Sequence, residues 1–215
     1  MIVDSTALLE KTCDDIIESA FGSAGQRCSG LRVAYIQEDI FDQICEMLSG
    51  ALNELKVAEA HDISTDIAPV IDANAKESLE KHISEMEKSA KLIAKGDGEI
   101  NVADDCFVAP HIFEIPSINR LEKENFGPVL HLVRFERDDI DKVIEEINST
   151  GYGLTFGVQS RISEFIRYIV PKINAGNIYI NRSVIGSIVE THPFGGMNLS
   201  GTGPKAGGHE YIKRF

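Results

Sequence analysis

A cysteine in a stretch of small residues is the first candidate for chemistry in this sequence. Cys28 lies between Gly25 and Gly30, and these neighbours leave space around its sulfur. A thiol that attacks a carbonyl must be reachable and must ionise; a loop position, backbone N–H dipoles and a cation such as Arg27 favour both. A small inert thiol fits the same setting. The residues alone leave both interpretations open.

A second candidate combines a carboxylate, an aromatic ring and a rigid turn within residues 124–128. Glu124 and Phe126 precede Gly127-Pro128 and then an apolar stretch that is typical of a strand. A carboxylate at a loop-to-strand junction can accept hydrogen bonds from both hydroxyls of a ribose, as acidic residues do in dinucleotide sites. A surface glutamate before a Gly-Pro turn is the alternative.

The C-terminal part of the chain is rich in glycine. Residues 186–208 contain seven of the 18 glycines, which excludes a helix and predicts an ordered loop that brings backbone close to a ligand or to other backbone, with a flexible tail as the alternative. The run at 201–208 suggests a phosphate-binding loop. It matches neither the dinucleotide-binding motif G-x-G-x-x-G nor the P-loop motif G-x-x-x-x-G-K-S/T, and it does not lie between a strand and a helix. We therefore do not expect it to bind a nucleotide.

The four cysteines show no metal-binding or disulfide pattern. Cys13, Cys28, Cys45 and Cys106 form no Cys-x-x-Cys pair, so we expect no metal site. A domain with its own core needs no disulfide framework, which favours a reducing compartment. Cys13 and Cys45 fall on apolar helical stripes and are predicted to lie in the core.

The spacing of apolar residues predicts the elements that hold these loops. In the first half we expect a helix over 5–21 capped by Asp4 or Ser5, a strand over 31–36, a helix over 40–52, a helix over 73–89 and a strand over 91–95. In the second half we expect strands at 129–135, 154–159 and 177–180, with helices at 138–148 and 163–172 between them. Such alternation predicts an α/β fold with a mostly parallel sheet and helices on both faces.

Composition excludes several classes of protein. The chain has 215 residues, with 21 Lys+Arg against 34 Asp+Glu, so its net charge of −13 disfavours nucleic acid as a partner. Its 43% hydrophobic residues are sufficient for one large or two small domains. We find no apolar stretch of membrane-spanning length and no basic start typical of a signal peptide, and therefore expect a soluble, cytoplasmic protein.

Taken together, these segments resemble the aldehyde dehydrogenase superfamily along essentially the whole chain. The family's cysteine motif is matched by residues 21–28, and its Glu-x-Phe-Gly-Pro motif follows at Glu124, close to the family's interval. The segments 177–182 and 193–196 match its C-terminal signature. Within the superfamily, residues 25–29, 186–189 and 199–208 are most similar to the L-glutamate γ-semialdehyde (1-pyrroline-5-carboxylate) dehydrogenases, in particular those of bifunctional bacterial proline-utilisation proteins.

The resemblance implies a role for each matching residue. Cys28 would be the nucleophile, giving a thiohemiacetal and, after hydride transfer to NAD, a thioester that water hydrolyses to L-glutamate; its backbone N–H would help to hold the oxyanion. Glu124 would bind the nicotinamide ribose, and Phe126 would pack near the nicotinamide ring. The implied substrate-binding residues, for the α-carboxylate, the amine and the aliphatic stem, are Ser29, Gly186, Ser187 and Phe194. For Phe194, a place in the core is an alternative.

The resemblance also shows what this sequence lacks. Full-length family members have an N-terminal NAD-binding domain, the glutamate of a Glu-x-Gly-Gly segment as general base, and an oxyanion-hole asparagine, none of which matches residues 1–215. We therefore expect a catalytic domain that shows no turnover by itself and belongs to a longer, homo-oligomeric protein. Whether a proline dehydrogenase is fused, with the membrane association it could bring, and whether NADP replaces NAD remain open. A dehydrogenase for another aldehyde and a non-catalytic structural domain are the alternatives.

Overall fold

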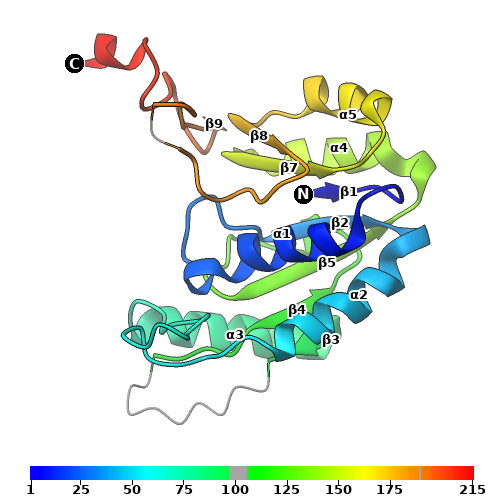
Figure 1. Ribbon diagram of the computed structural model, residues 1–215, viewed down its shortest axis with the longest axis vertical. Coiled ribbons are helices and arrows are strands. Elements are labelled where there is room, and N and C mark those ends of the chain that lie inside the picture. Colours follow the sequence, from blue (N-terminus) through cyan, green and yellow to red (C-terminus); the bar gives the residue numbers. More distant parts are fainter. Residues whose placement is uncertain (97–105, 189) are drawn as a thin grey trace.

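The chain is organised around one seven-stranded sheet, shown in the computed structural model of Figure 1, which describes residues 1–96, 106–188 and 190–215. The strand order is β3-β4-β5-β2-β1-β7-β8, and neighbours are parallel except for the pair β3 and β4. The strands of this sheet are β1 (Ile2–Val3), β2 (Val33–Gln37), β3 (Lys91–Lys95), β4 (His111–Glu114), β5 (Val129–Phe135), β7 (Thr155–Gln159) and β8 (Asn177–Ile180). The predicted α/β class with a mostly parallel sheet is confirmed.

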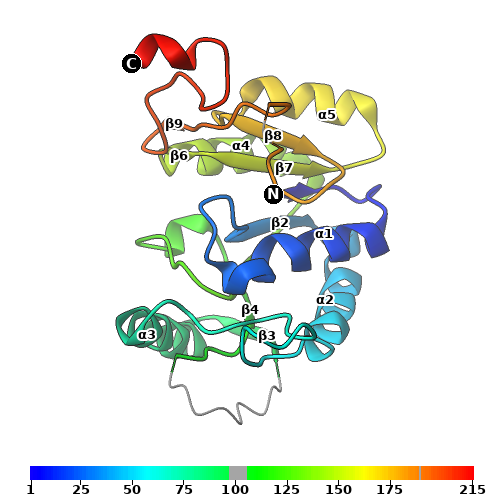
Figure 2. The same ribbon diagram turned by 60° about the vertical axis from the view of Figure 1, so that its left-hand side comes forward.

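Helices cover both faces of the sheet (Figures 1 and 2). On one face α1 (Leu9–Phe21) and α2 (Glu38–Asn53) pack on one apolar cluster; on the other, α3 (Ala73–Ser89), α4 (Ile140–Ser149) and α5 (Ser163–Ile169) pack on a second. The central strands contribute to both: Ala34 and Ile36 point to the first cluster, whereas Val33 and Tyr35 point to the second. This two-sided burial explains the nearly continuous apolar runs of these strands. No helix in the described ranges is both long and apolar enough to cross a membrane.

Most predicted elements are confirmed, and the differences lie at their ends. The helix over 73–89 and the strands over 91–95, 129–135 and 177–180 have the predicted bounds. The expected cap of the first helix is wrong: α1 begins at Leu9 after Leu8, because the Asp4 carboxylate instead accepts hydrogen bonds from the backbone N–H and hydroxyl of Thr6. The strands β1 and β4 were not predicted; β1 has only two residues, too few to show a period.

Four further predictions concern two cysteines and the ends of two helices. Cys13 is buried as predicted, but Cys45 is only half-buried, packed at the margin of the first cluster. The expected helix over 138–148 begins as a 3₁₀ turn and becomes α-helical at Ile140, and the helix expected to run to Lys172 ends at Ile169, followed by a 3₁₀ turn that contains Pro171. Proline removes a backbone donor, which explains the second change.

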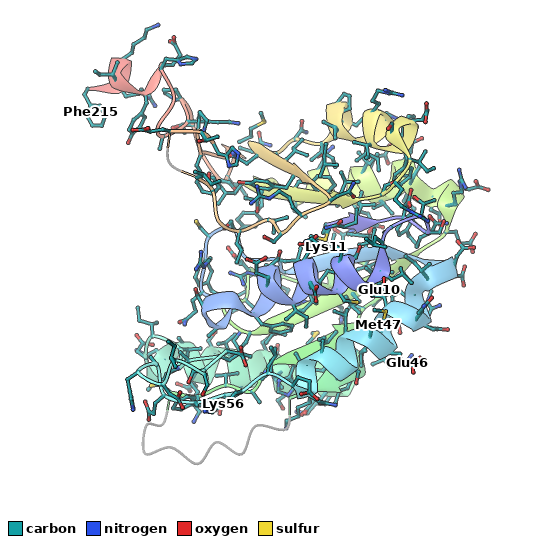
Figure 3. All side chains as sticks on the ribbon, in the orientation of Figure 1. Glu10, Lys11, Glu46, Met47, Lys56 and Phe215 are labelled. Carbon is teal, nitrogen blue, oxygen red and sulfur yellow. The ribbon has the colours of Figure 1, made fainter. Side chains whose placement is uncertain are left out.

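The glycine-rich C-terminal part forms backbone pairs with the rest of the chain. Strand β9 (Met197–Asn198) pairs with β6 (Tyr152–Gly153), and Phe194 exchanges two backbone hydrogen bonds with Ala206. A Cβ at Gly176 would lie 1.7 Å from the carbonyl oxygen of Gly195, so the predicted close approach of backbone to backbone is confirmed. The last residues extend away from the sheet, and Phe215 is 93% exposed (Figure 3).

Candidate functional site

The two motifs meet because they precede neighbouring parallel strands. Cys28 lies in the loop before β2, and Glu124 lies in the loop before β5. The two strands pair in parallel with Val33 opposite His131, so their amino ends lie at the same edge of the sheet. Residues 96 positions apart in sequence are thereby brought to one place. This edge is opposite to the carboxyl-end crevice where most open α/β sheets bind ligands.

Glycine allows the two loops to touch. Gly25 has a φ of +66°, and a Cβ there would lie 2.2 Å from the carbonyl oxygen of Gly127. The two residues before it, Ser23 and Ala24, also have positive φ, so the chain makes a tight left-handed turn just ahead of the cysteine. The glycines of the two motifs therefore serve close packing of one loop on the other.

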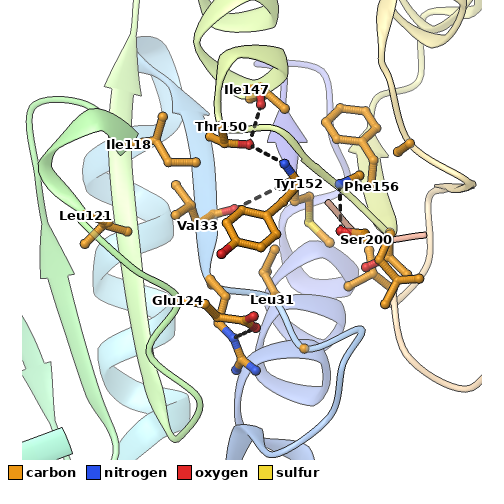
Figure 4. A pocket seen from close by; sticks show the side chains of 18 of the residues that line it. Leu31, Val33, Ile118, Leu121, Glu124, Ile147, Thr150, Tyr152, Phe156 and Ser200 are labelled. Carbon is orange, nitrogen blue, oxygen red and sulfur yellow. Dashed lines mark hydrogen bonds and ion pairs between the residues drawn. The ribbon is translucent and has the colours of Figure 1, made fainter. Parts of the chain in front are cut away.

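Cys28, Glu124 and Phe126 line one cavity of about 580 Å³. The cysteine and the carboxylate are exposed to it, and the Phe126 ring is 43% exposed. Figure 4 shows Glu124 and Tyr152 entering this cavity from different sides, with Ser200 to the right of Tyr152. A reachable thiol, a carboxylate and an aromatic ring thus share one space open to solvent.

The remaining predicted residues lie outside the lining of this cavity, which includes none of Ser29, Gly186, Ser187 and Phe194. Ser29 is buried and its carbonyl oxygen accepts a hydrogen bond from Thr155. Phe194 is partly buried and lines a second, smaller hollow with the 195–206 segment.

The loop that carries Gly186 and Ser187 nevertheless packs close to the cysteine loop. The backbone N–H of Val184 donates to Ser19 near the end of α1, and the Ile185 side chain lies next to Gly22. Val184 itself lines the cavity. The predicted anchor loop is therefore a neighbour of the cysteine loop and reaches the cavity through Val184, whereas Gly186 and Ser187 do not line it.

Arg32 is a site residue that we did not identify from the sequence. Its side chain lies between the two motif loops, and its Nε is 3.0 Å from Oε1 of Glu124. Burial lowers the pKa of Arg32, and the Glu124 carboxylate and the Cys28 thiolate oppose this shift. The available signal was a cation placed immediately before an apolar strand that follows the cysteine loop.

The environments of the cysteines predict different rates of alkylation. Burial raises the pKa of Cys13 to about 12 and that of Cys45 to about 11, so few of these thiols ionise near pH 8. Cys28 is exposed. We expect iodoacetamide to modify Cys28 at least about tenfold faster than either of them, measured by peptide mass spectrometry. Equal rates at the three positions would favour an inert thiol.

A pair of buried histidines supports the backbone of this site. Nδ1 of His131 lies 3.1 Å from the carbonyl oxygen of Arg32, and its Nε2 lies 2.9 Å from Nε2 of His82. Burial, the main cause, lowers the pKa of His131 to about 4, so this histidine is neutral near pH 7. A neutral His131 that donates from Nδ1 to the carbonyl can only accept at Nε2, and His82 therefore donates to it.

The fold is expected to lose stability at acidic pH because of this histidine pair. Between its unfolded pKa of 6.5 and about 4, His131 binds a proton more readily in the unfolded chain. Its contribution to stability is complete above pH 6.5 and is lost as pH falls through this window, at a cost of about 3 kcal/mol. We expect His131→Phe to remove most of this pH dependence from urea unfolding curves, whereas His61→Phe at an exposed position retains it. An unchanged slope in His131→Phe would contradict the assignment.

Comparisons with known proteins show which proteins this chain is similar to. The model of the aldehyde dehydrogenase family matches residues 1–215. The bifunctional protein PutA of Klebsiella aerogenes is 47% identical over all of this chain, which spans 17% of that protein. A crystal structure of bifunctional proline utilization A (PutA) superposes with a TM-score of 0.95 at 48% identity, covering 99% of this chain and 22% of that one. A 1-pyrroline-5-carboxylate dehydrogenase from Thermus, solved with bound NAD, gives a TM-score of 0.90 at 31% identity over 100% of this chain and 41% of its own.

Proposed function

Because this chain belongs to the aldehyde dehydrogenase family, we propose that it is the cysteine-bearing catalytic domain of an NAD-dependent L-glutamate γ-semialdehyde dehydrogenase of proline catabolism. The observation that carries the proposal is the shared cavity of Cys28, Glu124 and Phe126. The relatives named for proline utilisation and 1-pyrroline-5-carboxylate support the choice of substrate. Residues 1–215 form this domain, and the NAD-binding domain and general base belong to other parts of the complete protein.

Cys28 performs the covalent chemistry in this proposal. Its thiolate sulfur adds to the aldehyde carbon, and the carbonyl electron pair moves to oxygen, giving a thiohemiacetal. Loss of a hydride from that carbon leaves a thioester, and water then releases L-glutamate and the free thiol. Within the described part of the chain, the Cys28 N–H donates to no acceptor, so it is available to hold the oxyanion.

Glu124 and Phe126 fit the nicotinamide end of NAD, which supplies the hydride acceptor when bound. Oε1 of Glu124 is taken by Arg32, while Oε2 accepts no hydrogen bond from the described residues and can receive a ribose hydroxyl. The Phe126 ring offers an apolar surface beside this carboxylate. Both residues project from the loop that leads into β5. This strand keeps Glu124 and Phe126 in place before the cofactor binds.

The anchor loop supports recognition of an amino acid end group. Gly186 is exposed, with a φ of +76°, and apart from its chain neighbours no atom of the described residues lies within 4 Å of where its Cβ would be, so a carboxylate can approach the backbone. The Ser187 hydroxyl donates to the carbonyl of His192, which leaves its oxygen to accept from an ammonium group. We assign to Ser29 a third polar contact and to Phe194 the aliphatic stem.

The partners follow from the same proposal. The substrate is L-glutamate γ-semialdehyde, a fused proline dehydrogenase can supply it, and the complete protein is a cytoplasmic homo-oligomer with no nucleic acid partner. The curated relative is named bifunctional, which supports the fusion.

The test uses a chimera in which these 215 residues replace the matching segment of the Klebsiella aerogenes protein. We expect the chimera to form NADH from glutamate semialdehyde, and the 215-residue chain alone to form none. Ser187→Ala in the chimera is expected to raise KM for this aldehyde about tenfold or more, since an ammonium contact is lost, and to leave propanal oxidation unchanged.

Two results would contradict the proposal. Unchanged glutamate semialdehyde oxidation in Ser187→Ala, with propanal preferred, would point to another aldehyde as substrate. A folded chimera with no activity toward any aldehyde would favour a non-catalytic structural domain. Ser183→Ala, in the same segment but upstream of the Gly-Ser pair, is the matched control.

A further inference from the structure

The guanidinium group of Arg32 connects the two motif loops. Nη1 donates to the carbonyl oxygen of Gly25 at 2.6 Å, and Nη2 donates to that of Arg27 at 3.1 Å. Nε donates to Glu124 at 3.0 Å, and the group lies 4.6 Å from the centre of the Phe126 ring. All three nitrogens are therefore engaged, two with the cysteine loop and one with the carboxylate.

The main chain of Arg32 is held as firmly as its side chain. Its carbonyl oxygen accepts hydrogen bonds from both the backbone N–H and Nδ1 of His131 on β5, at 3.0 and 3.1 Å. The side chain is only 14% exposed. The planar guanidinium group of Arg32, which extends from the amino end of β2, therefore has little freedom to reorient.

We propose that Arg32 is a positioning residue for the cofactor: it holds Glu124 and Phe126 in the orientation that receives the nicotinamide ribose, at a set distance from the Cys28 loop. This inference rests on the proposed function. The ion pair uses one carboxylate oxygen and presents the other to the ribose, and stacking against the guanidinium fixes the Phe126 ring. Without Arg32, the exposed Glu124 side chain would have to be ordered when the cofactor binds, which weakens binding.

Lysine cannot replace this arrangement fully. An ammonium group is a compact point charge and cannot donate to three acceptors in the fixed directions of a guanidinium plane. Arg32→Lys would keep the charge near Glu124 but lose contacts with the carbonyls of Gly25 and Arg27. We therefore expect an intermediate effect from lysine and a full effect from methionine.

The experiment measures NAD affinity in the chimera by isothermal titration calorimetry. We expect Arg32→Met to raise Kd and KM for NAD about tenfold or more, and Arg32→Lys about threefold, with KM for the aldehyde changed less than twofold. Arg134→Met is the matched control, because Arg134 also stacks on a phenylalanine and pairs with two carboxylates but lies outside the cavity. If Arg32→Met only loosened the structure, KM for NAD and KM for the aldehyde would both rise, and Arg134→Met would have the same effect.

A double-mutant cycle separates positioning from general stabilisation. If Arg32 acts through Glu124, Arg32→Met in a Glu124→Gln background raises Kd for NAD less than twofold. A full tenfold effect in that background, or an effect of Arg32→Met no larger than that of Arg134→Met, would overturn the inference. Failure of the parent chimera to bind NAD would overturn the proposed role of Glu124 and Phe126 in binding this cofactor. Failure to oxidise glutamate semialdehyde while NAD still binds would refute only the proposed substrate.

Discussion

Replacing Cys28 by serine in the chimera is expected to lower kcat for aldehyde oxidation at least about a thousandfold. A serine hydroxyl is almost entirely protonated near neutral pH, and no histidine is among the described residues that line the cavity, so no imidazole there removes its proton. Addition to the carbonyl, the first covalent step, would therefore become rate-limiting. NADH formation at saturating substrate measures the effect, and calorimetry is expected to show unchanged NAD affinity.

A second cysteine provides the control for this substitution. Cys45 lies on α2, is half-buried and does not line the cavity, so Cys45→Ser makes the same atomic change away from the site. We expect it to keep kcat within about twofold. Wild-type turnover in Cys28→Ser would exclude this sulfur as the nucleophile and would leave the cavity without a covalent role.

The other large effect is expected from Gly25→Ala. Alanine would have to adopt a φ of +66°, which costs about 1–2 kcal/mol for an L-residue. Its methyl group would also lie 2.2 Å from the carbonyl oxygen of Gly127, so the two motif loops would have to move apart. We expect the free energy of unfolding, measured with urea on the 215-residue chain, to fall by about 3 kcal/mol or more.

Gly207→Ala separates backbone strain from the clash. Gly207 has a φ of +75°, but in the part of the chain that the structure describes only its chain neighbours come within 4 Å of its would-be Cβ. The control is therefore expected to lose only the roughly 1–2 kcal/mol that comes from the left-handed conformation. Equal losses in the two variants would show that contact between the loops contributes nothing to stability.

Local pattern was sufficient to predict much of the fold and to single out the candidate site residues. Apolar period and turn residues predicted the α/β class, the bounds of α3 and β5 and the burial of Cys13, because these depend on neighbours a few positions away. The glycines around Cys28 and the Gly-Pro after Phe126 likewise indicated two loops that could do chemistry. The two-residue strand β1 was missed for the same reason, since it carries too few residues to show a period.

Only the tertiary structure decided how these parts meet. The insertion of β1 between β2 and β7, and the parallel pairing of β2 with β5, join residues far apart in the chain, and no local period records such partners. That pairing places the cysteine loop and the Glu124 loop at one edge of the sheet and puts Arg32 between them. The candidate nucleophile and carboxylate are thus properties of the sequence, whereas the distance between them and the cation that connects them arise from strand order.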